Sequence, residues 1–117
     1  MFKGFKKKFV KVNKGKIFCR IAGKGPPLLL LHGYPQTHVM WHKTANKLSK
    51  SFTIVVADLR GYGSSFVLPA DKKHLNYSKK QMAKDMVELM NKLGFKKFLL
   101  AGHDRGGRVA HRMARDF

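Results

Sequence analysis

The sequence predicts an α/β fold in which a mostly parallel sheet is covered by crossover helices. Three observations support this prediction. Apolar runs of strand length alternate with longer segments of helical periodicity, two runs near the start are spaced for a hairpin, and glycines mark the ends of several segments. We expect strands at residues 7–11, 16–22, 27–32, 52–57 and 97–101, and helices at 38–50, 78–93 and 105–116.

The helix expected at 78–93 has the clearest local signals. Ser78 and Gln81 have the spacing of a capping box, and Tyr77 and Met82 flank it as a hydrophobic staple. Gly94 is placed to end the helix. The helix has one apolar face, which is more typical of a core than of a cofactor site and is formed by Met82, Met86, Leu89, Met90 and Leu93.

A glycine-flanked aspartate follows the last predicted strand. Residues 99–107 read Leu-Leu-Ala-Gly-His-Asp-Arg-Gly-Gly, and a helical pattern begins directly afterwards. The pattern Gly102-x-Asp104-x-Gly106 is typical of a nucleophile elbow, whose strained turn needs small residues on both sides of the nucleophile. An Asp at the tip implies carboxylate attack and a covalent ester. The alternative is a glycine-rich turn in which Asp104 caps the helix.

A second loop strengthens the elbow interpretation. Residues 32–35, His-Gly-Tyr-Pro, follow the apolar strand at 27–31. In the α/β-hydrolase architecture, the loop at this place supplies one N–H of the oxyanion hole, and the residue after the nucleophile supplies the other. We therefore expect the backbone N–H groups of Tyr34 and Arg105 to stabilise an oxyanion.

Three blocks of the sequence, 32–37, 58–63 and 102–108, resemble those of the haloacetate (fluoroacetate) dehalogenases, a family of α/β hydrolases. The resemblance runs from about residue 16 to the end. It implies a small haloacid substrate, displacement of halide by Asp104, and binding of the substrate carboxylate by Arg105 and Arg108. Epoxide hydrolases and haloalkane dehalogenases also use an Asp nucleophile, but an apolar Trp usually follows it, where this chain has Arg105.

The spacing of the two arginines agrees with this implication. Positions three apart share one face of a helix, so both guanidinium groups can reach the mouth of the site beside Asp104. Planar guanidinium groups suit a carboxylate, and they would also hold an anion against an anionic nucleophile. The alternative for Arg108 is a solvated basic helix face shared with Arg112 and Arg115.

The sequence is expected to be one partial domain, residues 1–117, ending in the helix after the elbow. In α/β hydrolases the catalytic acid and His come later in the chain, and in the dehalogenases so does a helical cap. Among residues after Asp104 the only candidate base is His111, which lies two turns along the same helix and points away from the strand edge. The fragment is thus expected to be catalytically incomplete. The resemblance allows a homodimer for the complete enzyme. An epoxide hydrolase and a non-catalytic basic half-domain remain as alternatives.

The composition is strongly basic, with 25 Lys and Arg against 6 Asp and Glu and a net charge of +19. The lysines follow no repeated pattern with aromatic residues, so we expect no specific nucleic-acid partner, although non-specific polyanion binding follows from the charge. No signal peptide or long apolar run is present, which argues against membrane insertion. The single cysteine, Cys19, fits a reducing cytoplasm and a buried strand position.

Three weaker patterns predict neither a metal nor a cofactor. Residues 102–109 nearly match a phosphate-binding loop, but Arg108 and Val109 replace its Lys and hydroxyl residue. His38 and His42 have zinc-protease spacing, but Val39 replaces the catalytic Glu, so partly buried, hydrogen-bonded histidines are favoured. Residues 61–63, Gly-Tyr-Gly, lack the third glycine of a dinucleotide site and indicate a turn, with Arg60 exposed or near the pocket.

Overall fold

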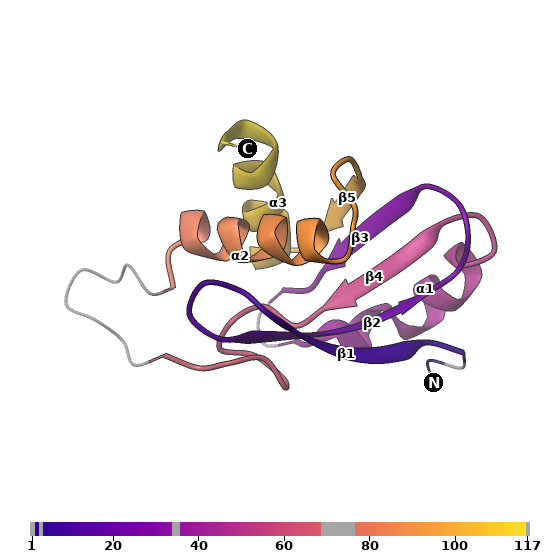
Figure 1. Cartoon of the computed structure of the whole chain (residues 1–117), viewed down its shortest axis with the longest axis horizontal. Coiled ribbons are helices and arrows are strands. Elements are labelled where there is room, and N and C mark those ends of the chain that lie inside the picture. The colour runs from indigo at the N-terminus through magenta and orange to yellow at the C-terminus, as the bar shows by residue number, and fades with distance from the viewer. Residues whose placement is uncertain (1, 3, 34–35, 69–76, 117) are drawn as a thin grey trace.

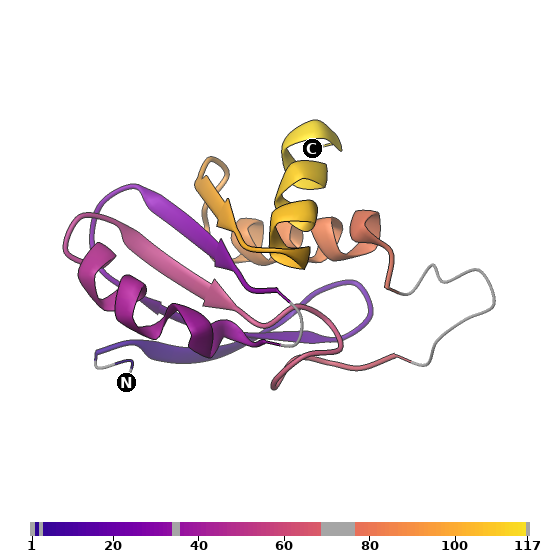
Figure 2. The ribbon, with the colours of Figure 1, turned by 180° about the vertical axis from the view of Figure 1, so that it is seen from behind.

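The computed structural model describes residues 2, 4–33, 36–68 and 77–116. A five-stranded mixed sheet has helices packed on both of its faces (Figures 1 and 2). The strands are β1 (Lys6–Lys11), β2 (Lys16–Ala22), β3 (Pro27–Leu31), β4 (Thr53–Ala57) and β5 (Leu99–Gly102), and the helices are the 3₁₀ helix η1 (His38–Trp41), α1 (His42–Leu48), α2 (Lys79–Lys92) and α3 (Arg105–Asp116). The predicted order of strands and helices is confirmed.

The strand order across the sheet is β1-β2-β4-β3-β5. The β1–β2 hairpin is antiparallel and joins β4 antiparallel, whereas β3 runs parallel to both β4 and β5. Crossover connections through α1 and α2 therefore bring the carboxyl ends of β3, β4 and β5 to one edge. Loops that leave this edge are the usual location of ligand sites in open α/β sheets.

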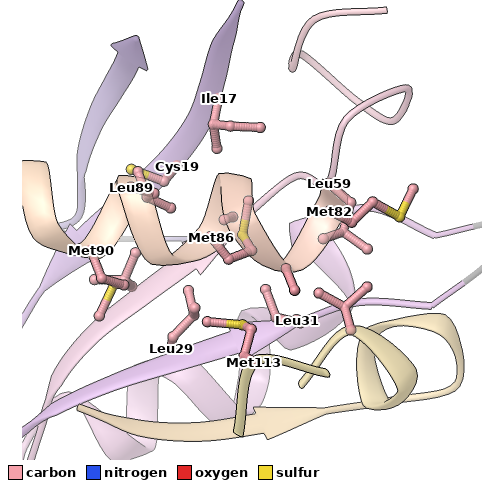
Figure 3. Close-up of a cluster of buried hydrophobic side chains, with 14 of the residues drawn as sticks. Ile17, Cys19, Leu29, Leu31, Leu59, Met82, Met86, Leu89, Met90 and Met113 are labelled. Carbon is pink, nitrogen blue, oxygen red and sulfur yellow. The ribbon is translucent and has the colours of Figure 1, made fainter. Parts of the chain in front are cut away.

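The sheet separates two apolar cores. The larger core lies under α2 and α3, where the methionines of α2 face Leu29 and Leu31 of β3 and Met113 of α3 (Figure 3). The smaller core lies under α1 on the opposite face and includes Leu28 and Leu30. Because successive residues of β3 point to opposite faces, its continuous run of leucines serves both cores.

The predicted ends of α2 are confirmed. Ser78 Oγ accepts a hydrogen bond from the Gln81 N–H at 3.2 Å. At the other end Gly94 has φ +94, and the Phe95 N–H donates to the Met90 carbonyl at 2.8 Å. This pair of features is a Schellman motif, which requires a left-handed residue after the helix.

Two predicted elements differ from the structure. The single helix expected at 38–50 is η1 followed by α1, because Asp58 binds both the backbone N–H and the ring of His38 and thereby fixes the first turn. The last strand is β5 (Leu99–Gly102) rather than 97–101. Among the described residues β5 pairs only with β3, and Leu99 is 52% exposed. Residues 69–76, between β4 and α2, lie outside the described residues.

Candidate active site

Asp104 lies at the tip of the turn that joins β5 to α3. Its φ of +53 is the only positive φ of a non-glycine residue among the residues that the structure describes. A left-handed conformation costs a residue with a Cβ energy, and such strain concentrates at functional positions. The exposed Asp104 side chain is thus presented at the carboxyl edge of the sheet.

The two flanking glycines are required by close backbone contacts. A Cβ on Gly102 would lie 2.4 Å from the Gly106 carbonyl oxygen. A Cβ on Gly106 would lie 2.4 Å from the carbonyl oxygens of both Leu31 and His32. The geometry therefore has the small residues that a nucleophile elbow needs, on both sides of Asp104.

The loop after β3 packs directly against this turn. A Cβ on Gly33 would approach the Asp104 Cβ to 2.6 Å and the His103 carbonyl oxygen to 2.9 Å. The two loops that the sequence pairs are therefore in contact. Tyr34, predicted to supply one oxyanion N–H, lies outside the described residues. Arg105, predicted to supply the other, is the first residue of α3.

His32 fixes the loop after β3 from beneath. Its buried ring donates from Nδ1 to the Gly33 carbonyl at 2.9 Å and accepts at Nε2 from the Leu59 N–H at 3.0 Å. Burial lowers the pKa of His32, which favours this neutral form. The ring also meets the edge of Tyr62, with centroids 5.1 Å apart. Sequence reasoning gave His32 no such positioning role.

The two predicted substrate-binding arginines occupy different surroundings. Arg105 is half-buried, and its Nη1 donates to the Tyr62 hydroxyl at 2.9 Å. Arg108 is exposed and lines a surface hollow together with Asp104. The structure thus brings Arg108 beside Asp104 and directs Arg105 toward the loop after β4. The rest of the hollow is formed by Lys79, Gly107, His111 and Arg112.

Lys79 lines the candidate site and was not singled out in the sequence analysis. It is the first residue of α2 and half-buried. Burial and the positive charges of Arg105 and Arg108 lower the pKa of Lys79, and the charge of Asp104 opposes this shift. The ammonium therefore lies within electrostatic reach of Asp104, Arg105 and Arg108. No local pattern indicates this, because Lys79 is 25 positions before Asp104.

The loop after β4 contains a second, buried carboxylate. Asp58 Oδ1 accepts from the backbone N–H of His38 at 2.7 Å and from its ring Nδ1 at 2.8 Å. Asp58 Oδ2 accepts from the Ser64 N–H at 3.1 Å. Burial raises the pKa of Asp58, but the hydrogen bonds from His38 and Ser64 outweigh it and hold the pKa below its usual value. This network positions the loops rather than offering a reactive group.

The structure tests the expectations for His38 and Arg60. His38 is buried and hydrogen-bonded, with Nε2 accepting from Arg20 Nε at 2.9 Å, as the non-metal interpretation predicted. The expectation that Arg60 is exposed or near the pocket is wrong. Arg60 is buried and forms two bonds to Asp85, at 2.5 and 2.6 Å, because its charge can enter the core only with a partner.

Three further observations describe the surroundings of the site. Within residues 2, 4–33, 36–68 and 77–116, no three His, Cys, Asp or Glu side chains gather as metal ligands would. Over the same residues, no helix is long and apolar enough to cross a membrane. Cys19 is buried in β2, as expected, and burial raises the pKa of its thiol to about 11.

The geometry agrees with the comparisons to known proteins. The model of the alpha/beta hydrolase fold family matches residues 26–117. The chain is 52% identical to a fluoroacetate dehalogenase from Burkholderia sp over 116 residues, and 42% identical to a soluble epoxide hydrolase from Corynebacterium sp. (strain C12) over 105 residues. These alignments cover 99% and 90% of the chain.

A solved structure from Nostoc sp PCC 7120, provisionally described as an alpha/beta hydrolase, superposes over 99% of the chain with a TM-score of 0.97 and 55% identity. The chain spans only part of each of these relatives. It covers 38% of the dehalogenase, 35% of the epoxide hydrolase and 40% of the Nostoc protein.

Proposed function

This chain belongs to the alpha/beta hydrolase fold family, and on that premise we propose that it carries the nucleophile of a hydrolase that releases halide from haloacetate. The observation that carries the proposal is the elbow. Asp104 has a left-handed backbone between two sterically required glycines, and the cations Arg108 and Lys79 line the hollow beside it. An exposed carboxylate amid fixed positive charge is suited to attack on an anionic substrate.

The first step is an in-line displacement. A carboxylate oxygen of Asp104 attacks the carbon that bears the halogen, a C–O bond forms, and the halide leaves with the electron pair of the broken bond. The product is a carboxymethyl ester of Asp104. Arg108 and Arg105 would hold the substrate carboxylate, which reduces its repulsion by the Asp104 carboxylate and orients the reacting carbon.

The second step is hydrolysis of that ester. Water attacks the side-chain carbonyl carbon of Asp104, and the N–H groups of Arg105 and Tyr34 stabilise the oxyanion. The carboxylate re-forms as the C–O bond to the alkyl oxygen breaks, and that oxygen takes up a proton and leaves as the hydroxyl of glycolate. A general base must accept the proton of the water. His111 lines the same hollow but lies seven residues after Asp104, about 10 Å along the helix axis. We propose that the base belongs to the part of the fold that the relatives have and that these residues do not cover.

An epoxide hydrolase is the second candidate, because a relative with that activity is 42% identical. It would use Asp104 in the same displacement but would open a neutral ring, so it has no need for cations that bind a carboxylate. The residue after the nucleophile, Arg105, favours the anionic substrate. The two activities therefore differ in whether turnover of the substrate requires Arg108.

The experiment is Arg108→Lys in the longer hydrolase that contains these residues. Lysine keeps the charge but loses the planar fork, and a charge-assisted two-bond clamp is worth about 2–4 kcal/mol. We expect kcat/KM for chloroacetate to fall roughly 30- to 1000-fold, with little effect on a neutral epoxide. Arg115→Lys, on the exposed end of α3, is the matched control. Unaltered chloroacetate turnover together with efficient epoxide opening would establish the epoxide hydrolase instead.

A further inference from the structure

The β1–β2 hairpin presents a basic face with an exposed aromatic ring. The register pairs Lys7 with Arg20, Phe9 with Phe18, and Lys11 with Lys16. Directly opposed residues of an antiparallel pair point to the same face, and so do alternate residues of one strand. These six side chains therefore share one face of the hairpin, which we call the Phe9 face. Figure 1 shows β1 at the margin of the sheet.

Phe9 is 57% exposed, although its ring is supported on one side by its cross-strand neighbour. The centroid of the buried Phe18 ring lies 5.0 Å from that of Phe9. Phe18 is in turn held by the His38 ring at 5.2 Å and by the Arg20 guanidinium at 5.6 Å. A supported aromatic ring that remains open to solvent offers a surface on which another planar ring can stack.

The charged side chains of the Phe9 face are all positive. Lys7, Lys11 and Lys16 are exposed, and none of the six acidic residues of the chain precedes Asp58. Along β1, Lys7 and Lys11 flank Phe9 at a separation of roughly 14 Å. A second copy of the chain is a poor occupant, because pairing two β1 edges would bring lysines together. The face is complementary to a polyanion that also carries planar groups.

We propose that the Phe9 face binds single-stranded nucleic acid without sequence preference. Phosphates would pair with Lys7, Lys11 and Lys16, and an unpaired base would stack on Phe9, which is how sequence-tolerant single-strand surfaces combine charge with aromatic rings. A duplex keeps its bases stacked within the helix. An anionic membrane is less suited, because one exposed ring gives far less apolar area than an interfacial anchor needs. The inference goes beyond the proposed hydrolase activity and does not depend on it.

The test is the binding of this chain to a labelled oligo(dT) of about 12 nucleotides, measured by fluorescence anisotropy. This length is within the roughly 4–16 nucleotides that an OB-fold domain covers on single strands. Phe9→Ala and Phe9→Leu should each weaken binding roughly 5- to 30-fold, and Phe9→Trp should restore it. Phe9→Leu keeps an apolar contact with Phe18, and circular dichroism verifies the fold of each variant. Val67→Ala, at another exposed apolar residue, is the control and should bind normally.

Charge variants separate this face from the overall positive charge. Lys7, Lys11 and Lys16 are changed together to Gln, and the control changes the exposed Lys84, Lys96 and Lys97 to Gln. The first set should weaken oligo(dT) binding at least tenfold more than the second and lower the salt slope by about 2. Equal losses from both sets, or no effect of Phe9→Ala, would overturn the proposal. If the variants of the Phe9 face lost binding to phosphatidylglycerol vesicles but kept normal oligo(dT) binding, the face would be assigned to membranes. That result would also overturn the proposal.

Discussion

Asp58 and Asp104 both follow strands of the parallel part of the sheet, yet their surroundings differ in every respect. Asp58 directly follows β4, is 1% exposed, and accepts hydrogen bonds from His38 and Ser64. Asp104 follows β5, is exposed, and has a left-handed backbone beside Arg108. Burial with saturated hydrogen bonds makes one carboxylate a structural group, whereas exposure on a strained turn makes the other a candidate nucleophile.

The loops that follow β3, β4 and β5 also depend on one another. Asp58 holds η1 through His38, and the adjacent Leu59 N–H donates to His32, whose own loop packs on Asp104. Tyr62, farther along the loop after β4, contacts both His32 and Arg105. The buried carboxylate therefore stabilises the loops that surround the exposed one.

The largest expected effect is that of Asp104→Asn on catalysis. In the proposed function a neutral amide cannot displace halide, so kcat of a full-length hydrolase that contains these residues should fall at least roughly 1000-fold. Because the Asp104 side chain is exposed, thermal unfolding should shift little. Halide release and a melting curve, recorded on the same preparation, check both parts. Retained turnover would show that Asp104 is not the nucleophile.

Asp58→Asn should have the opposite pattern, with a large effect on folding. An amide keeps one acceptor for His38, but its NH₂ group meets the Ser64 N–H donor, and the buried network loses its charge. We expect the free energy of unfolding to fall by about 2–4 kcal/mol. Chemical denaturation of this chain measures it. Asp116→Asn, at an exposed ion pair, is the control and should lower the free energy of unfolding far less.

The same network predicts how stability depends on pH. The pKa of Asp58 is lower in the folded chain than in the unfolded one, so the folded state favours the ionised form. Its contribution is therefore present above the unfolded pKa of about 3.9 and is lost as pH falls through the lower folded pKa. The gap in stability between the wild type and Asp58→Asn should shrink below about pH 4. A difference in stability that stays constant with pH would contradict the lowered pKa of Asp58 in the folded chain.

The elements and the elbow could be predicted because their signals are local. The caps of α2 and the glycines around Asp104 occupy positions that the turn geometry fixes within a few residues. The partners of Asp58 and Arg60 could not be predicted, because they lie 20 and 25 positions away in the sequence. For the same reason the sequence did not reveal that Phe9 shares a face with the lysines of both hairpin strands, since this depends on the register of β1 and β2.

Lys79 provides the smallest effect and tests whether the cations around Asp104 act together. Its ammonium lies within electrostatic reach of Asp104, Arg105 and Arg108. Lys79→Met removes one positive charge from the mouth of the site while keeping much of the side-chain bulk. We expect kcat/KM for chloroacetate in the longer hydrolase to fall roughly 3- to 10-fold, mainly through KM, because a partly exposed charge attracts the anion without contacting the reacting atoms.

The neighbouring Lys80→Met removes the same charge from an exposed position of α2 and is the matched control. The difference between the two variants should decrease at high salt, where charges at partly exposed positions are screened. Equal effects of Lys79→Met and Lys80→Met would assign the loss to the net charge of the protein. In that case the electrostatic surroundings of Asp104 would be set by its two arginines, and the contrast with the hydrogen-bonded Asp58 would rest on exposure and backbone strain.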